Sequence, residues 1–249
     1  FLGISLGVAT LIIVMSVMNG FREELTSKIL GINGHLKIQS LTNKNNSDYI
    51  TVKIKLNSEV SNINITEVLS SQGLMSFKGY SSGVITKGVS PEMFYQRKIF
   101  KNKIDKKQLV EFSKNNGIFI GEKLGKRLNI REGDFINILS SDGYETILGK
   151  IPRSGNFKVI GFFNTGMFEY DTSLIIFPIF LLQEFLGVNN KIDFLEIELD
   201  KFNNFEFVKE KISKEIPKSF KIVDWRSLNP SLFNAIEVEK NVMFLILLL

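Results

Sequence analysis

The sequence contains no cysteine and a single histidine, His35. Without cysteine there are no disulfides and no thiolate metal sites. The other possible metal ligands do not have the spacing of a metal-binding cluster, and the short motifs of nucleotide-binding loops, serine hydrolases and zinc hydrolases are missing. His35 has no neighbouring carboxylate, which is more typical of a residue that caps a strand or the helix before it. We therefore expect no cofactor in this chain, and any nucleotide hydrolysis must belong to a partner.

A concentrated block of basic residues is also missing. The net charge of +5 comes from 31 Lys and Arg against 26 Asp and Glu, spread along 249 residues. Proteins that bind nucleic acid carry basic patches, often with interleaved aromatic residues. We therefore expect no nucleic-acid partner.

Charge is absent from both ends of the sequence. Residues 1–18 carry no charged side chain, and residues 242–249 form a second apolar run. A helix needs about 20 apolar residues to cross the bilayer core. We interpret residues 1–20 as the end of a first transmembrane helix and residues 231–249 as a stalk and the start of a second one, so that the sequence is a piece of a longer membrane protein. The alternative is that residues 1–20 form a buried helix of a soluble protein.

Residues 21–34 are predicted to continue the first helix into water as an amphipathic stalk. Apolar residues recur there at helical spacing, with charges on the other face: Phe21, Leu25 and Ile29. Glycine favours helix ends, so the stalk is expected to end at Gly31 or Gly34. Near the other apolar run, three charged residues are expected to mark the membrane boundary: Glu237, Glu239 and Lys240.

From residue 35 the pattern changes to short segments in which apolar and polar residues alternate, as in half-buried strands. Strands are predicted at 36–39, 51–56, 74–80 and 83–89. A polar loop is predicted at 41–47, a short helix at 60–69, and a helix that begins at Ser90-Pro91 and runs to Phe100. A Lys-rich, weakly patterned stretch at 101–116 indicates a subdomain boundary.

The next segments predict a mostly β unit, followed by a return to alternating strands and helices. They are a strand, helix and Gly-Asp turn at 117–134, strands at 135–139, 157–163 and 173–177, and a helix at 178–185 closed by Gly187. The last third is predicted as a strand at 194–199, a helix at 205–212 and a strand at 220–223. We expect an α+β fold in which residues 35–105 are completed by residues 191–230, with residues 106–190 inserted between them.

A long excursion at 140–156 separates two of the predicted strands. Connections of this length are uncommon in compact domains and are often functional. Apolar residues cluster in its central part, 146–153, and Pro152 stiffens the backbone there. The alternative is an extended β-hairpin that folds back on its own domain. A second segment with carboxylates, Glu169 and Asp171, suggests a polar turn before a strand more than acid–base chemistry.

Several segments resemble the lipoprotein-releasing ABC transporter permeases of the LolC/LolE type. Residues 3–31, from Gly-Ile-Ser-Leu-Gly-Val to Ile-Leu-Gly, are similar to the first transmembrane helix and stalk of that family. Residues 232–243, Leu-Phe-Asn-Ala-Ile-Glu-Val-Glu-Lys-Asn-Val-Met, and 166–171, Gly-Met-Phe-Glu-Tyr-Asp, are close to its pattern. The element at 121–134 is shared more broadly with MacB-like permeases.

This resemblance implies a multi-pass subunit of the bacterial inner membrane, with the 21–240 region in the periplasm. Its MacB-like domain would consist of a porter-like subdomain, 35–105 and 191–230, and an inserted sabre-like subdomain, 106–190. The implied partners are a second permease subunit in a homo- or heterodimer, a cytoplasmic ATPase that holds ATP and Mg, a periplasmic lipoprotein chaperone, lipoprotein substrates and membrane lipids. The chain itself would be a transport subunit and not an enzyme.

The resemblance also implies a chaperone-binding hook within the 140–156 loop. The matching residues are Thr146, Ile147, Leu148, Gly149, Lys150, Ile151, Pro152 and Arg153. Where the family often reads Thr-Pro-x-Gly-x-x-Pro, Gly149 and Pro152 fit and Ile147 replaces the first proline. The loop is therefore either a chaperone hook or its modified equivalent in a LolE-like or hybrid subunit.

Acyl chains need an apolar enclosure, and flexible Met side chains adapt to chains of different shape. The residues expected to line such a lipid or lipoprotein cavity are Val14, Met15, Val17, Met18 and Met243. The main competing function is a MacB- or FtsX-like mechanotransmitting permease that regulates a periplasmic hydrolase or an efflux partner. A membrane-anchored periplasmic enzyme is a third possibility, but the sequence offers no catalytic constellation for it.

Overall fold

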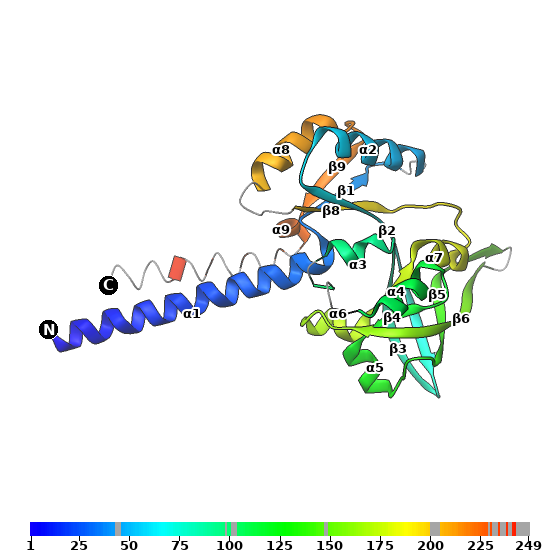
Figure 1. The fold of residues 1–249 in the computed structure, drawn as a ribbon, viewed down its shortest axis with the longest axis horizontal. Coiled ribbons are helices and arrows are strands. Elements are labelled where there is room, and N and C mark those ends of the chain that lie inside the picture. The colour runs from blue at the N-terminus through cyan, green and yellow to red at the C-terminus, as the bar shows by residue number, and fades with distance from the viewer. Residues whose placement is uncertain are drawn as a thin grey trace.

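The computed structural model describes residues 1–42, 46–97, 99–100, 104–146, 149–199, 205–228, 230, 234, 238 and 241–242. Its longest element is α1 (Leu2–Asn33), which stands out from the rest of the molecule (Figure 1). The helix ends at Gly34, whose φ of 65° is readily available to glycine. Within the described residues, no helix combines the length and apolar character needed to cross a membrane. The transmembrane assignment of residues 1–20 therefore stays a prediction, whereas the stalk indeed ends at one of the two expected glycines.

One half of the globular part is a four-stranded antiparallel sheet. Its strands are β1 (Leu36–Ser40), the first part of β2 (Ile63–Phe77), β8 (Phe194–Leu199) and β9 (Phe220–Asp224), in the order β2-β8-β1-β9. The helices α2 (Asn46–Glu59) and α8 (Phe205–Glu215) connect these strands and lie together on the outer side of the sheet (Figure 1). This β-α-β-β-α-β order is the ferredoxin-like arrangement, here interrupted between β2 and β8. We call it the ferredoxin-like half.

The segment between β2 and β8 forms a closed β-barrel. The second part of β2 pairs with both β3 (Tyr80–Val89) and β5 (Phe135–Thr146). The ring continues through β6 (Gly149–Phe163), β4 (Ile118–Gly121) and β7 (Leu174–Pro178), which pairs with β3 and closes it. Closure leaves this sheet without free edges. We call this part the barrel half.

Short helices lie around the barrel: α3 (Glu92–Gln96), α4 (Lys106–Ser113), α5 (Glu122–Leu128), α6 (Phe168–Ser173) and α7 (Ile179–Leu186). A further short helix, α9 (Trp225–Leu228), follows β9 in the ferredoxin-like half. The barrel interior is filled by buried aliphatic and aromatic side chains, Ile120, Ile138 and Phe177 among them. A separate aromatic cluster around Phe94 and Phe112 packs under α3 and α4. In the ferredoxin-like half, buried side chains from the helices and the sheet pack together, Leu56, Ile197 and Ile212 among them, so each half has a core of its own.

The structure corrects two predicted elements. The predicted strand at 51–56 is part of α2: Val52 and Leu56, four residues apart, are buried, whereas Ile54, which completed the alternating pattern, is 65% exposed. The predicted helix at 60–69 lies mostly in β2, which pairs with β8. The β-branched residues at 63–68 fit a pleated strand better than a helix. Alternation over the six residues at 51–56 therefore did not distinguish a helix from a strand.

Other boundaries differ by less. The predicted loop at 41–47 includes the start of α2, and residues 43–45 lie outside the described residues. The helix after Pro91 ends at Gln96 and not at Phe100. Residues 101–116 include α4, which begins with a capping box between Asp105 and Gln108. The strand–helix–turn at 117–134 and the elements of the last third are confirmed. The subdomain limits at 105–106 and 190–191 stay predictions.

Candidate functional site

The last turn of α1 ends in a buried position between the ferredoxin-like half and the barrel half (Figure 1). Ile29, Leu30 and Ile32 are buried there. The approach at Gly31 is close, because a Cβ at that position would lie 3.0 Å from the side chain of Ile99. The buried end of α1 is therefore attached to the domain by packing as well as by the chain that follows it.

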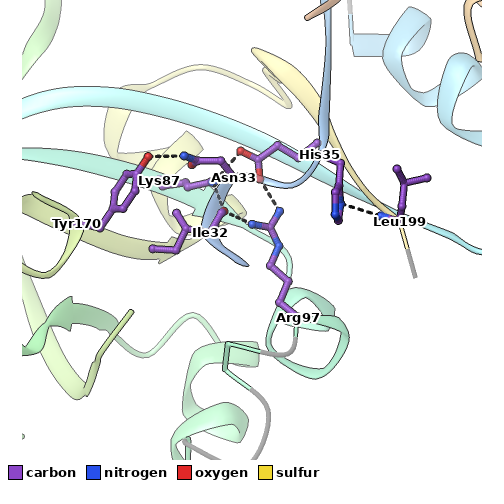
Figure 2. A network of polar contacts seen from close by, with 8 residues as sticks. Ile32, Asn33, His35, Lys87, Arg97, Tyr170 and Leu199 are labelled. Carbon is purple, nitrogen blue, oxygen red and sulfur yellow. Dashed lines mark hydrogen bonds and ion pairs between the residues drawn. The ribbon is translucent and has the colours of Figure 1, made fainter. Parts of the chain in front are cut away.

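A cluster of polar groups, which we call the stalk socket, holds this helix end. It consists of Ile32, Asn33, Lys87, Arg97, Tyr170 and Glu196. The carbonyl of Ile32 accepts a hydrogen bond from Lys87 Nζ at 3.0 Å and another from the guanidinium of Arg97. The last carbonyls of a helix have no partner within the helix, and cations are favourable beside them. Two positive side chains thus cap the C-terminal end of α1, as Figure 2 shows.

The same two cations bind one carboxylate, that of Glu196. Lys87 Nζ lies 2.7 Å from Oε1 and 3.0 Å from Oε2, and Arg97 donates to Oε2 through Nη2. All three side chains are buried, with relative exposures of 7% for Lys87, 1% for Arg97 and 3% for Glu196. Buried charges are tolerated when they are paired and hydrogen-bonded. This triad satisfies that condition.

Burial and the neighbouring charges act in opposite directions on the pKa values of Lys87 and Glu196. Burial lowers the pKa of Lys87 to about 8, although Glu196 acts against the shift. For Glu196, burial acts to raise the pKa, but the charges of Lys87 and Arg97 outweigh it and hold the pKa below its usual value. Glu196 therefore stays ionised at neutral pH.

Two further contacts surround the triad (Figure 2). The amide nitrogen of Asn33, the last residue of α1, donates to the hydroxyl of Tyr170 on α6. His35 lies between α1 and β1, is buried, and accepts a hydrogen bond from the backbone N–H of Leu199 at 3.0 Å through Nδ1. The interpretation of His35 as a capping residue is confirmed. Burial raises the pKa of the Tyr170 hydroxyl, so it remains protonated.

Distant parts of the sequence supply the stalk socket. Lys87 is on β3, Arg97 follows α3, Tyr170 is on α6 and Glu196 is on β8. None of these four residues was predicted as a site residue from the sequence. The available signal was weak: Lys87 and Glu196 each interrupt a predicted strand at a position that proves to be buried.

The predicted hook lies at the end of the β5–β6 hairpin, on the side of the molecule opposite to α1 (Figure 1). The strands pair from Phe135↔Lys158 to Thr146↔Gly149, with a register shift between Ser140 and Gly143. The excursion at 140–156 is therefore an extended β-hairpin, which was the alternative interpretation of this segment. Ile147 and Leu148 lie outside the described residues, as do the side chains of Thr146 and Lys150.

The described part of the hairpin is exposed near its tip and anchored at its base. Ile151 is 55% exposed, and Pro152 beside it is exposed as well. Ser71 Oγ donates to Asp142 Oδ2 at 2.7 Å, which ties the base of the hairpin to β2. The guanidinium of Arg153 lies against Gly187 at the end of α7, where an added Cβ would collide with it. Arg153 is therefore directed toward the domain. The hairpin is thus preformed where it leaves the barrel.

The predicted cavity residues are all on α1 except Met243, which lies outside the described residues. Met15 and Met18 are half-buried, whereas Val14 and Val17 are exposed. The structure therefore does not bring these residues together around an enclosed space within the described residues.

Of the two carboxylates in the 166–171 segment, that of Asp171 has a structural role. Asp171 is buried on α6 and accepts hydrogen bonds from the backbone N–H and the hydroxyl of Thr165, both at 2.8 Å. These bonds hold the turn before α6. The segment expected to be a polar turn before a strand is thus a short helix, α6, which is followed directly by β7. Across the described part of the chain, no group of His, Asp and Glu could hold a metal ion. The predicted boundary residues Glu237, Glu239 and Lys240 lie outside it.

Comparison with known proteins agrees with this fold. A family model described as MacB-like periplasmic core domain matches residues 1–215. The periplasmic region of MacB from Actinobacillus actinomycetemcomitans superposes with a TM-score of 0.51 at 15% identity, covering 83% of this chain and 96% of that one. The chain belongs to the family of MacB-like periplasmic core domains, and the predicted α+β fold is confirmed.

The curated relatives narrow the family further. The lipoprotein-releasing system transmembrane protein LolC of Neisseria meningitidis is 28% identical over 99% of this chain and 60% of its own length. The corresponding protein LolE of Haemophilus influenzae is 24% identical over the whole chain and 60% of its own length. The predicted LolC/LolE type is thus confirmed. The chain spans about three fifths of the length of these relatives.

Proposed function

We propose that this chain is part of a permease subunit of an ABC transporter that extracts lipoproteins from the bacterial inner membrane and passes them to a periplasmic chaperone. The observation that carries the proposal is similarity to LolC and LolE proteins over nearly the whole chain, from the long first helix through both halves of the domain. In this proposal the subunit is a transport protein, and ATP hydrolysis takes place in a separate cytoplasmic ATPase.

In this proposal, residues 1–20 lie in the membrane and the domain lies in the periplasm. Extraction transfers acyl chains out of the bilayer, and each CH₂ that loses its apolar surroundings costs about 0.8 kcal/mol. The release step therefore needs both ATP-driven work and an apolar receiver. Val14, Met15, Val17 and Met18 on α1, together with Met243, would contact the acyl chains before release.

The β5–β6 hairpin is the proposed chaperone-binding hook. Its ladder and the Asp142 contact fix its direction before any partner binds, which reduces the entropy lost on binding. Ile151 and Pro152 offer exposed apolar surface. We propose that these two residues and Leu148 are the apolar anchors of the hook. Lys150 is the residue proposed to steer acidic groups of the partner. Arg153, directed toward Gly187, is better placed to support the base of the hairpin.

Reconstitution tests the proposed function. The full-length protein, its second permease subunit and its ATPase are placed in proteoliposomes that contain a mature lipoprotein, and soluble chaperone is added outside. We expect lipoprotein to move into the soluble fraction only with ATP and chaperone. If ATP is hydrolysed and the complex is intact but lipoprotein stays in the liposomes, the proposal is wrong.

A mechanotransmitting permease that regulates a periplasmic hydrolase or an efflux partner is the second candidate. The buried attachment of α1 to both halves favours it, because such an attachment transmits movement whether or not a substrate is carried. Identification of the proteins that co-purify with the full-length protein separates the candidates. A hydrolase or an efflux component in place of a lipoprotein chaperone supports the second one.

A further inference from the structure

We propose that Lys87, Arg97 and Glu196 form a latch that makes α1, the ferredoxin-like half and the barrel half move as one body. This inference rests on the proposed function in one respect: the latch would be the step by which movement of the stalk reaches the hook. The three side chains are positioning residues in this proposal, since they act through α1 and contact no substrate.

The first argument is where the three side chains originate. Glu196 belongs to β8 of the ferredoxin-like half, and Lys87 belongs to β3 of the barrel. Arg97 follows α3, whose Met93 and Phe94 pack in the aromatic cluster between the halves. Lys87 therefore joins α1 to the barrel through the Ile32 carbonyl and joins the barrel to the ferredoxin-like half through Glu196. Arg97 bridges the same carbonyl and the same carboxylate, so α1 is linked to the ferredoxin-like half through these two cations.

The second argument is charge. The triad contains two cations and one anion, so Glu196 alone leaves one positive charge without a counter-ion. The C-terminal end of α1 carries partial negative charge on its unpaired carbonyls. The helix end therefore completes the charge balance of a buried cluster. Withdrawal of the helix would leave a net positive charge in a low-dielectric interior, which is strongly unfavourable.

The third argument is distance. A shift of α1 by one residue moves its backbone by about 1.5 Å along the axis and turns it by about 100°. The hydrogen bond between Lys87 Nζ and the Ile32 carbonyl is 3.0 Å long, close to the usual optimum. Displacement of α1 along its axis by about 1.5 Å without rotation breaks this bond and the one from Arg97. With the rotation, the next carbonyl would take the same place, but a residue with a Cβ would then replace Gly31, where an added Cβ lies 3.0 Å from Ile99. The socket therefore fixes the register of α1, and force applied to the helix passes to the domain.

Spin-label distances in the full-length protein test the latch without reference to lipoproteins. The 249 residues contain no cysteine, so within them each spin label attaches only to a cysteine that is introduced for it. Glu23→Cys on α1 is combined with Tyr80→Cys on the barrel, or with Ile54→Cys on α2; all three positions are exposed. The test variant is Lys87→Met/Arg97→Met/Glu196→Leu, since apolar replacement of a whole buried charge cluster is usually compatible with folding.

We expect both distance distributions to become at least about twofold wider in the triple variant. The matched control is Lys53→Met/Glu67→Leu, which removes a half-exposed ion pair of 3.0 Å between α2 and β2 and is expected to leave both widths unchanged. Unchanged widths in the triple variant overturn the latch. If the triple variant does not fold, Arg97→Lys is used, which keeps the charge but loses the forked contact to Ile32 and Glu196; here too, unchanged widths overturn the proposal.

The reconstituted transporter provides the functional readout. In the triple variant we expect ATP hydrolysis and chaperone binding within about twofold of the parent, but at least about tenfold less lipoprotein released per ATP. Release per ATP equal to that of the parent contradicts the latch. If the parent itself releases no lipoprotein, the proposed function fails, and the spin-label widths still decide the latch.

Discussion

The stalk socket and the β5–β6 hairpin are built in opposite ways. The socket joins residues from distant parts of the chain, with Lys87 and Glu196 separated by 109 positions, and buries their charges. The hairpin is local: its two strands follow each other in sequence and pair with each other, and near its tip it exposes Ile151 and Pro152. The socket is thus built to resist displacement of α1, and the hairpin is built to present exposed side chains. Contacts that are long-range and buried fix a helix, whereas a local ladder can present side chains at little cost to the rest of the fold.

The largest effect is expected from breaking the socket with a single change. Glu196→Leu leaves Lys87 and Arg97 buried without an anion, and removal of one partner from a buried ion pair costs about 3–5 kcal/mol. Amide hydrogen exchange of β8 in the full-length protein measures this loss. The triple apolar variant should lose much less, because it leaves no buried charge. If the single and triple variants are equally unstable, the charges are not what holds the socket.

A smaller effect is expected for the ion pair between buried Asp224 and half-exposed Lys209 at the edge of the ferredoxin-like half. Asp224 accepts hydrogen bonds from Lys209 Nζ at 2.7 Å and from the backbone N–H of Ser227 at 2.9 Å. Burial acts to raise its pKa, but these bonds outweigh it and lower the pKa to about 2. Asp224→Asn is expected to cost about 1 kcal/mol at pH 7.

The pH dependence of that variant has a definite sign. Because the pKa of Asp224 is depressed in the folded protein, its contribution is present above pH 3.8 and is lost as pH falls through about 2. The stability difference between the parent and Asp224→Asn should therefore be constant near neutral pH and shrink between about pH 4 and pH 2. Urea unfolding at several pH values measures it, and a difference that grows on acidification contradicts the assignment.

Tyr170→Phe tests the second contact of the socket. The change removes the hydroxyl that Asn33 binds and keeps the ring in place. We expect a loss of about 1 kcal/mol, the usual net value of one hydrogen bond. Hydrogen exchange in the last turn of α1 should accelerate, while exchange in β8 stays the same. Equal acceleration in both places would indicate general destabilisation and not a contact specific to the helix end.

The smallest effect on stability is expected at the hairpin. Ile151→Ser changes an exposed side chain, so the folding free energy should change by less than about 0.5 kcal/mol. Binding of the chaperone should nevertheless weaken, because an apolar anchor is lost. Ile54→Ser is the matched control: Ile54 is similarly exposed, at 65%, but lies on α2. Equal binding by both variants in a pull-down removes Ile151 from the proposed hook.

Sequence patterns predicted the elements that depend on local signals. The strand at 194–199 and the helix that follows Pro178 agree with the structure because alternation, proline and glycine mark them directly. Segments 51–56 and 60–69 were misassigned, since short apolar patterns fit a helix and a strand almost equally well. The length of the 140–156 excursion pointed to the hairpin. The socket could not be predicted, because no local pattern relates Ile32 to Lys87, Arg97 and Glu196.

Strand β2 runs through both halves without interruption. It pairs with β8 from Ile63 to Val68 and with β3 from Leu69 to Phe77. Fifteen residues at about 3.3 Å each give a rod of about 50 Å, stiffened by hydrogen bonds along its length. The two halves therefore share one continuous strand, and a hinge between them would have to bend this strand at the Val68–Leu69 junction. Because the socket is close to α1 and the hairpin is far from it, a small tilt of α1 is expected to produce a larger displacement at the tip of the hairpin.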